Sequence, residues 1–429
     1  MRSESRCHGD SYPIPKFSPE RDDVEGFMDE LRGFHEQFRD CFTRSEPREH
    51  FRLYMSGQFS PLERKSIEPI ALQIEDGKVR AMQRFVSDVV WDEPLMLRRY
   101  HTLVAEDMGD PEGVLILDES GFAKKGDDSI GVARQYCGST GKVDNCQVGV
   151  FAAYASRHGY AFLDKRLYLP RNWFEETHSE RRRKCRMPVE LTFQTKPQLA
   201  AEMYRDLRAE GIVPFKYVVA DSVYGANPDF IGAVEGRVGT TYFVSMPSDT
   251  LCWLQGPSTE QRAVRGKGGT KVRRAVSDGE KKPVDFATLA GLIHSFFWYR
   301  RKVSEGTKGP IEYEFTKRRV TLCKGGLPDK TVWLVIKRTL GTNREYSYYI
   351  SNAPVSARLE LFVWLSGVRW AIEQCFEEAK SELGMDHYEV RKYPGWNHHM
   401  LTCMLAHFFL RHLSIKSGKK STVHYTVAA

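Results

Sequence analysis

Two short apolar runs, each followed at once by an acidic residue, constrain the fold of this chain most. Residues 114–120 read VLILDES and residues 217–225 read YVVADSVYG. An apolar run without alternation is typical of a strand that is buried on both faces. Asp118 and Asp221 stand where these runs end, and open α/β sheets place active sites at such strand ends. A lone aspartate after an apolar run is more often a helix cap or turn residue, so each motif needs support from elsewhere.

Residues 369–384, RWAIEQCFEEAKSELG, predict an amphipathic helix. Apolar residues recur there at three- and four-residue steps, so one stripe of the helix should be buried. A different face, within an arc of about 80°, carries four charged residues. These are Arg369, Glu373, Glu377 and Lys380. The alternative is a surface helix with intrahelical salt bridges, such as Arg369 with Glu373 or Glu377 with Lys380.

Together these motifs resemble the DDE transposases of bacterial insertion sequences. The last signature of that family is Tyr, two residues, Arg, three residues, Glu, six residues, Lys, and this chain matches it at Arg369, Glu373 and Lys380. Ser366 stands where the family has its tyrosine. The strings DESGFAKKG, GVARQYCG and DNCQVGVFAAYAS are similar to the branch usually called IS-seven-hundred-and-one, within the IS-four-like group. The resemblance covers residues 20 to 415, approximately.

The resemblance implies that Asp118, Asp221 and Glu373 are the catalytic acids and hold two Mg²⁺ ions, with Mn²⁺ as a possible substitute. Two divalent ions about 3.5 to 4 Å apart can stabilise the attacking and leaving oxygens of a phosphodiester displacement. Such ions prefer oxygen ligands and need only a few carboxylates. Arg369 and Lys380 are then expected to pair with DNA phosphates. The block ADSVYG resembles the second-aspartate block of the family, and its tyrosine, Tyr224, is a predicted DNA-binding residue.

The order of predicted elements is three strands, a helix, a strand, a helix, a strand and the catalytic helix. This is the ribonuclease H-like α/β order expected of the resembled family. We therefore predict a catalytic domain over 109–248 and 354–413. The 152 positions from Asp221 to Glu373 exceed what one strand and one helix need. A β-rich insertion domain is predicted over 249–353, because this segment contains β-like runs and glycine-bearing turns.

A basic stretch in the predicted insertion, residues 261–274, reads QRAVRGKGGTKVRR and contains no acid. We interpret it as a glycine-rich loop that binds DNA phosphates, against the alternative of a merely solvated basic loop. Its predicted DNA-binding residues are Arg262, Arg265, Lys267, Lys271, Arg273 and Arg274.

The first 108 residues read as amphipathic helices. The resemblance implies that this helical N-terminal domain binds the ends of the element and helps to dimerise, whereas a helical cap that only supports the catalytic domain is the alternative. Residues 78–84 and 94–99 are candidates for a helix that reads DNA. Residues 414–429 are predicted to be a flexible basic tail.

Composition sets wider limits on function. The net charge of +7 is modest for 429 residues, so nucleic-acid binding should depend on local clusters. No run approaches the roughly 18 apolar residues of a membrane span, and the N-terminus lacks a signal-peptide core. We expect a cytoplasmic, nucleoid-associated bacterial protein. Its nine cysteines form no CxxC pair and should be reduced thiols. The histidines within HHMLTCMLAHFFLRHL are expected to pack in a helix and not to bind zinc.

The predicted function is that of a DNA transposase, which cleaves at transposon ends in a metal-dependent reaction and transfers the 3′ ends into target DNA. The partners are double-stranded DNA, as transposon ends and as target, and a second copy of the chain in a synaptic homodimer. Three alternatives remain: a ribonuclease H-like nuclease without strand transfer, a domesticated DNA-binding protein, and a carboxylate-pair hydrolase without metal. The last gives no reason for Arg369 and Lys380 to accompany Glu373.

Overall fold

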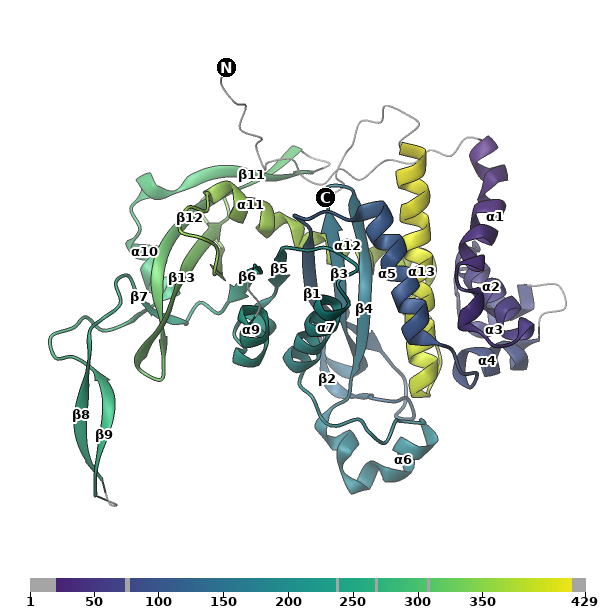
Figure 1. The fold of residues 1–429 in the computed structure, drawn as a ribbon, viewed down its shortest axis with the longest axis horizontal. Coiled ribbons are helices and arrows are strands. Elements are labelled where there is room, and N and C mark those ends of the chain that lie inside the picture. Colours follow the sequence, from purple (N-terminus) through teal and green to yellow (C-terminus); the bar gives the residue numbers. More distant parts are fainter. Residues whose placement is uncertain (1–20, 74–77, 237–238, 267–268, 307–308, 419–429) are drawn as a thin grey trace. The chain divides into compact units, whose positions relative to one another are not determined.

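The computed structural model describes residues 21–73, 78–236, 239–266, 269–306 and 309–418 (Figure 1). The chain divides into two compact units. One contains Tyr217–Val368 and is called the Asp221 unit here; the other, the Asp118 unit, contains the described residues before Tyr217 and from Arg369 onward. Across the described part of the chain, every helix is too short or too polar to span a membrane. The domain boundaries predicted at residues 108, 248 and 353 do not coincide with the unit boundaries and stay predictions.

The Asp118 unit is built on an antiparallel sheet. Its strands are β1 (Val114–Ala123), β2 (Ala133–Cys137), β3 (Lys142–Ser156) and β4 (Gly159–Tyr168). Strand β3 pairs with each of the other three. The expected run of three long strands is confirmed, and β2 is a short additional strand that sequence reasoning missed. β1 begins with four fully buried residues, as its apolar run predicts.

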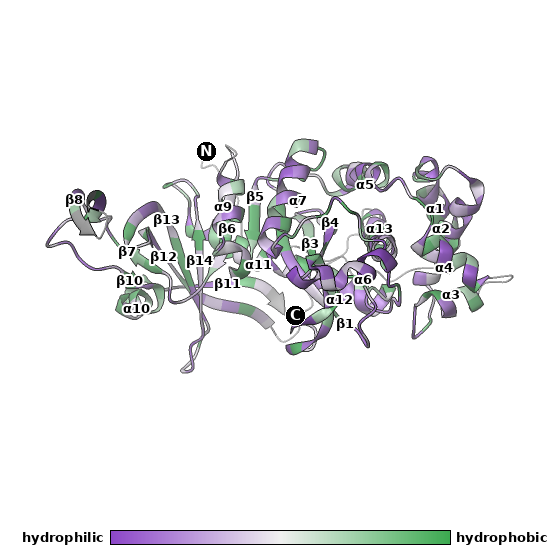
Figure 2. Cartoon of the chain, turned by 90° about the horizontal axis from the view of Figure 1, so that it is seen from below, coloured by the Kyte–Doolittle hydropathy of each residue, from purple (hydrophilic) through white to green (hydrophobic). Residues whose placement is uncertain are grey.

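Helices make up the rest of the Asp118 unit, and Figure 2 shows hydrophilic and hydrophobic positions side by side along α1 to α5. The N-terminal helices are α1 (Arg21–Glu36), α2 (Ser45–Gln58), α3 (Ile67–Gln73), α4 (Val79–Ser87) and α5 (Glu93–Met108). The later ones are α6 (Ser179–Lys184), α7 (Lys196–Glu210), α12 (Trp370–Leu383) and α13 (Tyr393–Gly418). Short 3₁₀ helices cover Arg39–Cys41, Arg171–Phe174 and Glu176–His178. The predicted helical character of the first 108 residues is thus confirmed for the part from Arg21 onward that the structure describes.

The start and end of α7 follow from its sequence. Thr195 and Gln198 form a capping box, in which each side chain accepts a hydrogen bond from the backbone N–H of the other. Gly211 ends the helix with φ 67°, the left-handed conformation that glycine adopts at lowest cost. The helix therefore begins and ends close to where the sequence predicts.

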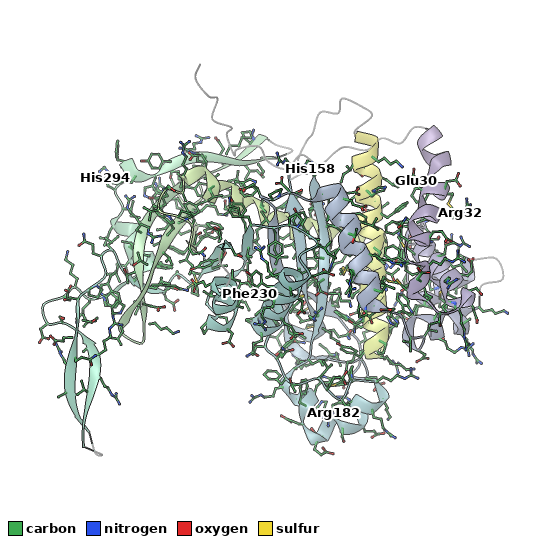
Figure 3. The ribbon with its side chains drawn as sticks, viewed as in Figure 1. Glu30, Arg32, His158, Arg182, Phe230 and His294 are labelled. Carbon is green, nitrogen blue, oxygen red and sulfur yellow. The ribbon has the colours of Figure 1, made fainter. Side chains whose placement is uncertain are left out.

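The C-terminal helix α13 is largely buried and packs on both the N-terminal helices and β4. Its histidines pack as expected. His398 stacks on Trp91 with ring centroids 4.1 Å apart, and His399 bonds to the Tyr54 hydroxyl at 2.7 Å. At the exposed side of the unit, Glu30 of α1, labelled in Figure 3, pairs with Lys416 of α13.

The Asp221 unit contains a mixed β-sheet. Strands β5 and β6 are parallel, and the order from there is β5-β6-β14-β13-β12-β7-β10, with β11 also paired to β12. The strands are β5 (Tyr217–Ala220), β6 (Thr241–Met246), β7 (Leu251–Trp253), β10 (Val284–Asp285), β11 (Tyr299–Gly306), β12 (Gly309–Lys324), β13 (Leu327–Arg338) and β14 (Tyr346–Ser351). β8 (Thr259–Gly266) and β9 (Gly269–Val276) form a separate hairpin. The helical elements are α8 (Ser222–Gly225), α9 (Pro228–Glu235), α10 (Phe286–Leu292), α11 (Leu359–Val368) and the 3₁₀ helix Ser295–Phe297. The prediction that 249–353 is rich in strands is confirmed.

The amphipathic helix predicted over 369–384 is confirmed as α12, Trp370–Leu383. Apolar residues repeat at helical spacing from Phe362 onward, but the helix is interrupted at Arg369, which separates α11 from α12. Arg369 itself keeps right-handed helical angles, φ −53° and ψ −30°. Periodicity reports only which positions are apolar, so it does not reveal a single break in backbone hydrogen bonding.

Candidate functional site in the Asp118 unit

Asp118 lies on β1 directly after the buried run, opposite Phe151 of β3. The prediction that the strand ends there is wrong, because β1 stays paired with β3 as far as Ala123. Its side chain is 17% exposed, and its Oδ1 accepts a hydrogen bond from the backbone N–H of Glu119 at 2.8 Å. Side chains of a strand alternate between its two faces, so Asp118, Ser120 and Phe122 share one face and Glu119 points to the other. On that other face, Glu119 pairs with Lys196 of α7 at 2.5 Å.

The guanidinium of Arg369 links two of the predicted catalytic acids. Its Nη1 donates to Oδ2 of Asp118 at 3.3 Å, and its Nη2 pairs with Oε1 of Glu373 one turn along α12. The intrahelical salt bridge that was the alternative interpretation is therefore present. The same guanidinium also reaches a carboxylate 251 positions away in the sequence, which a merely solvated helix would not do. Asp118, Arg369 and Glu373 thus form one cluster of charged side chains, the acid cluster.

On the face of β1 that carries Asp118, Ser120 accepts a hydrogen bond through its Oγ from Nζ of Lys380 on α12 at 2.8 Å. Its ammonium lies 5.4 Å from the ring centroid of Phe122. Burial lowers the pKa of Lys380, because the charged form loses solvent. The structure thus places Lys380 beside the strand that carries Asp118, as the shared helix face predicts, and Ser120 is a site residue that the sequence did not single out.

Aromatic packing holds α12 against the sheet. The ring of Phe376 makes edge-to-face contact with Phe151 of β3 at a centroid distance of 5.2 Å. It also lies 5.4 Å from the ring of Phe162 on β4. Such pairs contribute about 0.5–1.5 kcal/mol each beyond area burial. Because Phe151 is the register partner of Asp118, the same residue supports both the acid and the helix that faces it.

A polar network joins α12 to α13 and β4. Glu378 accepts hydrogen bonds from the Tyr160 hydroxyl at 2.8 Å and from Nε2 of His407 at 2.8 Å, and it pairs with Arg411. His407 and Arg411 are 2% and 13% exposed, so Glu378 supplies their partner inside the protein. The sequence analysis missed this network. The i, i+4 spacing of His407 and Arg411 on a helix was its only visible signal.

Asp221 belongs to the Asp221 unit. It follows β5 and caps α8, with Oδ1 accepting from the backbone N–H of Val223 at 2.9 Å. The strand followed by an acid and a turn is therefore as predicted. Tyr224 is fully buried, and its ring lies 5.8 Å from that of Phe230. In this structure Tyr224 packs the turn after Asp221, and its predicted contact with DNA stays a prediction.

The basic stretch 261–274 differs from the expected loop. It belongs to the β8–β9 hairpin, in which the two strands are paired and Arg262 is opposite Arg273. Arg262 pairs with Glu260 and Asp278, and Nε of Arg274 donates to the Thr259 hydroxyl at 3.0 Å. Lys267 lies outside the described residues, as do the side chains of Arg265 and Lys271. The DNA-binding role of the stretch stays a prediction.

A basic cluster near α6, residues 181–186, is largely structural. Arg182, labelled in Figure 3, donates to the backbone carbonyl oxygens of Trp173 and Glu175. Arg181 donates to the carbonyl of Asp127 at 2.6 Å. Both guanidiniums therefore hold backbone segments that precede α6, and the cluster is not simply a free phosphate-binding surface.

The acid cluster has the chemistry that a divalent ion needs. Asp118 and Glu373 are oxygen donors that one cationic group already bridges, and Mg²⁺ prefers such ligands. Over the ranges that the structure covers, no group of three or more His, Cys, Asp and Glu side chains is spaced to hold a metal. The two carboxylates therefore fit a metal ion by donor type.

Comparison with known proteins identifies the class. A family model described as DDE superfamily endonuclease matches residues 37–310, which is more than half of the chain, so the protein belongs to this family. The matched range includes Asp118 and Asp221 and ends before Glu373. The resemblance predicted from the acid motifs is confirmed, and a DDE-type enzyme is the class that it defines.

The chain is also similar to individual proteins. The chain is 25% identical over 371 residues to a probable transposase for insertion sequence element IS701 from Microchaete diplosiphon, covering 86% of this chain and 83% of that protein. Among solved structures it is similar to a piggyBac transposase in a synaptic complex with hairpin DNA, with TM-score 0.44, 8% identity, and 96% and 80% of the two chains covered. The NurA nuclease from Sulfolobus solfataricus matches with TM-score 0.28, 8% identity, and 69% and 86% coverage.

Proposed function

We propose that this DDE-family enzyme is a cut-and-paste DNA transposase with a ribonuclease H-like catalytic domain. It would cleave DNA at the ends of its element and transfer the 3′ ends into target DNA. Family membership supports the endonuclease class, and similarity to the IS701 transposase over most of both chains supports the transposase assignment. The observation that carries the proposal is the acid cluster, because Arg369 joins Asp118 to Glu373 across 251 positions of sequence.

In this proposal Asp118, Asp221 and Glu373 hold two Mg²⁺ ions, or Mn²⁺ in their place. When bound, such ions stabilise charge on the attacking and leaving oxygens of a phosphodiester. The donor set supports this assignment, since Asp118 and Glu373 are carboxylates held at one cationic group. Asp221 is added on the strength of its motif, an acid directly after a buried strand.

The cations of α12 would bind and orient the DNA strand. A guanidinium can bond a phosphate through two parallel N–H groups, and Arg369 sits beside both acids. Lys380 is held near β1 by the Ser120 hydroxyl, and its partial burial strengthens its attraction to an incoming phosphate. We assign Arg369 to the phosphate at the reacting centre and Lys380 to a neighbouring phosphate. Arg273 and the other basic residues of the β8–β9 hairpin would contact DNA away from the acids.

The test incubates purified protein with supercoiled DNA that carries the element's ends, with Mg²⁺ or with chelator. Variants Asp118→Ala, Asp221→Ala and Glu373→Ala should abolish both cleavage and joining. Glu377→Ala, an exposed acid of the same helix, is the matched control and should retain activity. Both ends of the element must be held in one complex, so active complexes should contain two copies of the chain. Light scattering measures this number.

A DNA nuclease of the same family is the second candidate, supported by the endonuclease description of the family. It would share every residue named above, and cleavage without any joined product would favour it. Metal-independent DNA binding without cleavage, unaffected by the three acid variants, would contradict both candidates.

A further inference from the structure

The exposed face of α4 has a composition suited to DNA. Among α1 to α5, α4 is the one helix without an aspartate or glutamate. Its exposed side chains include Arg80, Gln83 and Arg84, which lie on one face because they are three and four residues apart. Arginine pairs bidentately with guanine, and glutamine does so with adenine, in the DNA major groove.

This face lines a cleft of about 760 Å³. Arg391 and Lys392, from the segment before α13, also line it. Two of the three acids in the lining are engaged by cations: Asp88 by Lys392 and by Arg186 at 2.9 Å, and Glu389 by Arg64. The third is Glu68. The cleft therefore presents exposed arginines, and two of its three acidic side chains are already paired with cations.

The opposite face of α4 fixes the helix rigidly. Met82, Phe85 and Val86 are buried, and the backbone carbonyl of Val86 bonds to Nδ1 of His398 on α13 at 2.7 Å. Phe85 stacks on Trp91 with ring centroids 4.8 Å apart. A recognition element needs this support, because side chains on a helix held by packing reach base edges without first losing backbone freedom.

The helices around α4 point to the same use. Contacts join α2, α3 and α4 to one another, so α4 belongs to a packed group of helices. A helix that packs through one face and presents basic and amide side chains on the other is the kind of element that enters the major groove. By contrast, Arg99 of the other candidate segment, 94–99, is engaged by Asp40 and by the carbonyl of Gln37.

We infer that α4 is the sequence-reading helix of this protein, with Gln83 and Arg84 contacting base edges of double-stranded DNA at the element's ends. The inference rests on the proposed function and goes further by assigning end recognition to one helix. The duplex would approach the exposed face of α4.

The experiment measures binding by fluorescence anisotropy in chelator, so that no cleavage occurs. The probes are duplexes that tile the DNA flanking the coding sequence and a shuffled duplex of matched composition. Gln83→Ala removes no charge, and Arg84→Lys keeps the charge but loses the bidentate fork. Each should reduce the preference for the end duplex over the shuffled one by about 5- to 150-fold while leaving binding to the shuffled duplex nearly unchanged. Arg98→Ala, an exposed arginine of α5, is the control and should keep the preference.

An unchanged preference in both α4 variants would overturn the inference, as would a wild-type protein that prefers none of the flanking duplexes. Loss of self-association without loss of preference, measured by light scattering, would instead make this face an interface between two copies. These failures are separable from failure of the proposed function, because wild-type cleavage and joining with Mg²⁺ are measured independently of α4.

Discussion

Replacing Arg369 with alanine should strengthen the binding of a divalent ion to the protein without DNA. In the structure the guanidinium contacts Asp118 at 3.3 Å and pairs with Glu373, so an ion that uses these carboxylates competes with it. Without the guanidinium, two negative charges face each other, and a bound cation relieves their repulsion. Arg369 thus holds the two carboxylates in place but lowers their affinity for a metal ion. When DNA binds and the guanidinium moves to a phosphate, the carboxylates are released and their metal affinity rises.

The size of the effect follows from the exposure of the three side chains. Asp118, Arg369 and Glu373 are 17%, 32% and 48% exposed, so both contacts are screened by water. Partly exposed ion pairs contribute about 0.2–1 kcal/mol each, and their sum is about 0.4–2 kcal/mol. That sum corresponds to a Kd for the ion that falls by about 2- to 30-fold.

Titration with Mn²⁺, followed by electron paramagnetic resonance of the free ion, measures this Kd directly. Lys380→Ala is the matched control, since it removes a positive charge from the same helix, and its Nζ bonds to Ser120 at 2.8 Å. It should change the Kd less than Arg369→Ala does. Asp118→Asn should weaken binding in either background. An Mn²⁺ affinity that is equal or weaker in Arg369→Ala would refute the competition and make the guanidinium a support for the metal ligands.

Three further predictions concern stability. Glu378→Ala should lower the free energy of unfolding by about 3 kcal/mol, because it leaves the Arg411 and His407 side chains without their partner, whereas Glu378→Gln should cost less; chemical denaturation measures both. Phe376→Ala should cost up to about 3 kcal/mol in the same assay, less than a fully buried phenylalanine would, since it removes a half-buried ring packed on two others, and Phe376→Leu should recover part of this loss. Burial lowers the pKa of His399 to about 3, so the unfolded chain binds a proton there below pH 6.5 that the folded protein does not. Stability should therefore fall as the pH drops from 6.5, by about 2 kcal/mol at pH 5 from this group, and His399→Gln should reduce the fall seen by thermal denaturation. An equal fall in that variant would assign the pH dependence to other groups.

The sequence predicted the elements of the candidate site better than it predicted their supports. Apolar runs placed Asp118 and Asp221 directly after buried strand residues because such runs depend on local burial, and helical spacing placed Arg369 next to Glu373. The run at Asp221 also ends its strand, whereas β1 continues past Asp118 to Ala123, so a strand end was wrongly predicted there. The contact of Arg369 with Asp118 is long-range, so no local period contains it, and it was not predicted; the family resemblance implied only that Asp118 and Glu373 share the metal ions. The hydrogen bond between Glu378 and Tyr160 spans 218 positions, and the sequence analysis missed it because no local pattern contains it.

Two departures have local causes. The basic stretch 261–274 was interpreted as a loop because of its glycines, but the residues on either side of them pair as strands β8 and β9. The break at Arg369 also escaped the sequence analysis, since the apolar spacing continues through it. Both errors arise because composition and periodicity report which side chains can be buried and not where backbone hydrogen bonds form.

The position of the break at Arg369 also explains how Glu373 can be placed accurately. Glu373 belongs to the first turn of α12, where a helix has the fewest backbone hydrogen bonds of its own. Its position must therefore come from side chains further along: Phe376 on the aromatic rings of the sheet and Glu378 on α13 and β4. A displacement of about 1 Å at a reacting centre can cost a hundredfold in rate. Substitutions at Phe376 should consequently reduce DNA cleavage more than their loss of stability accounts for at temperatures where the protein stays folded.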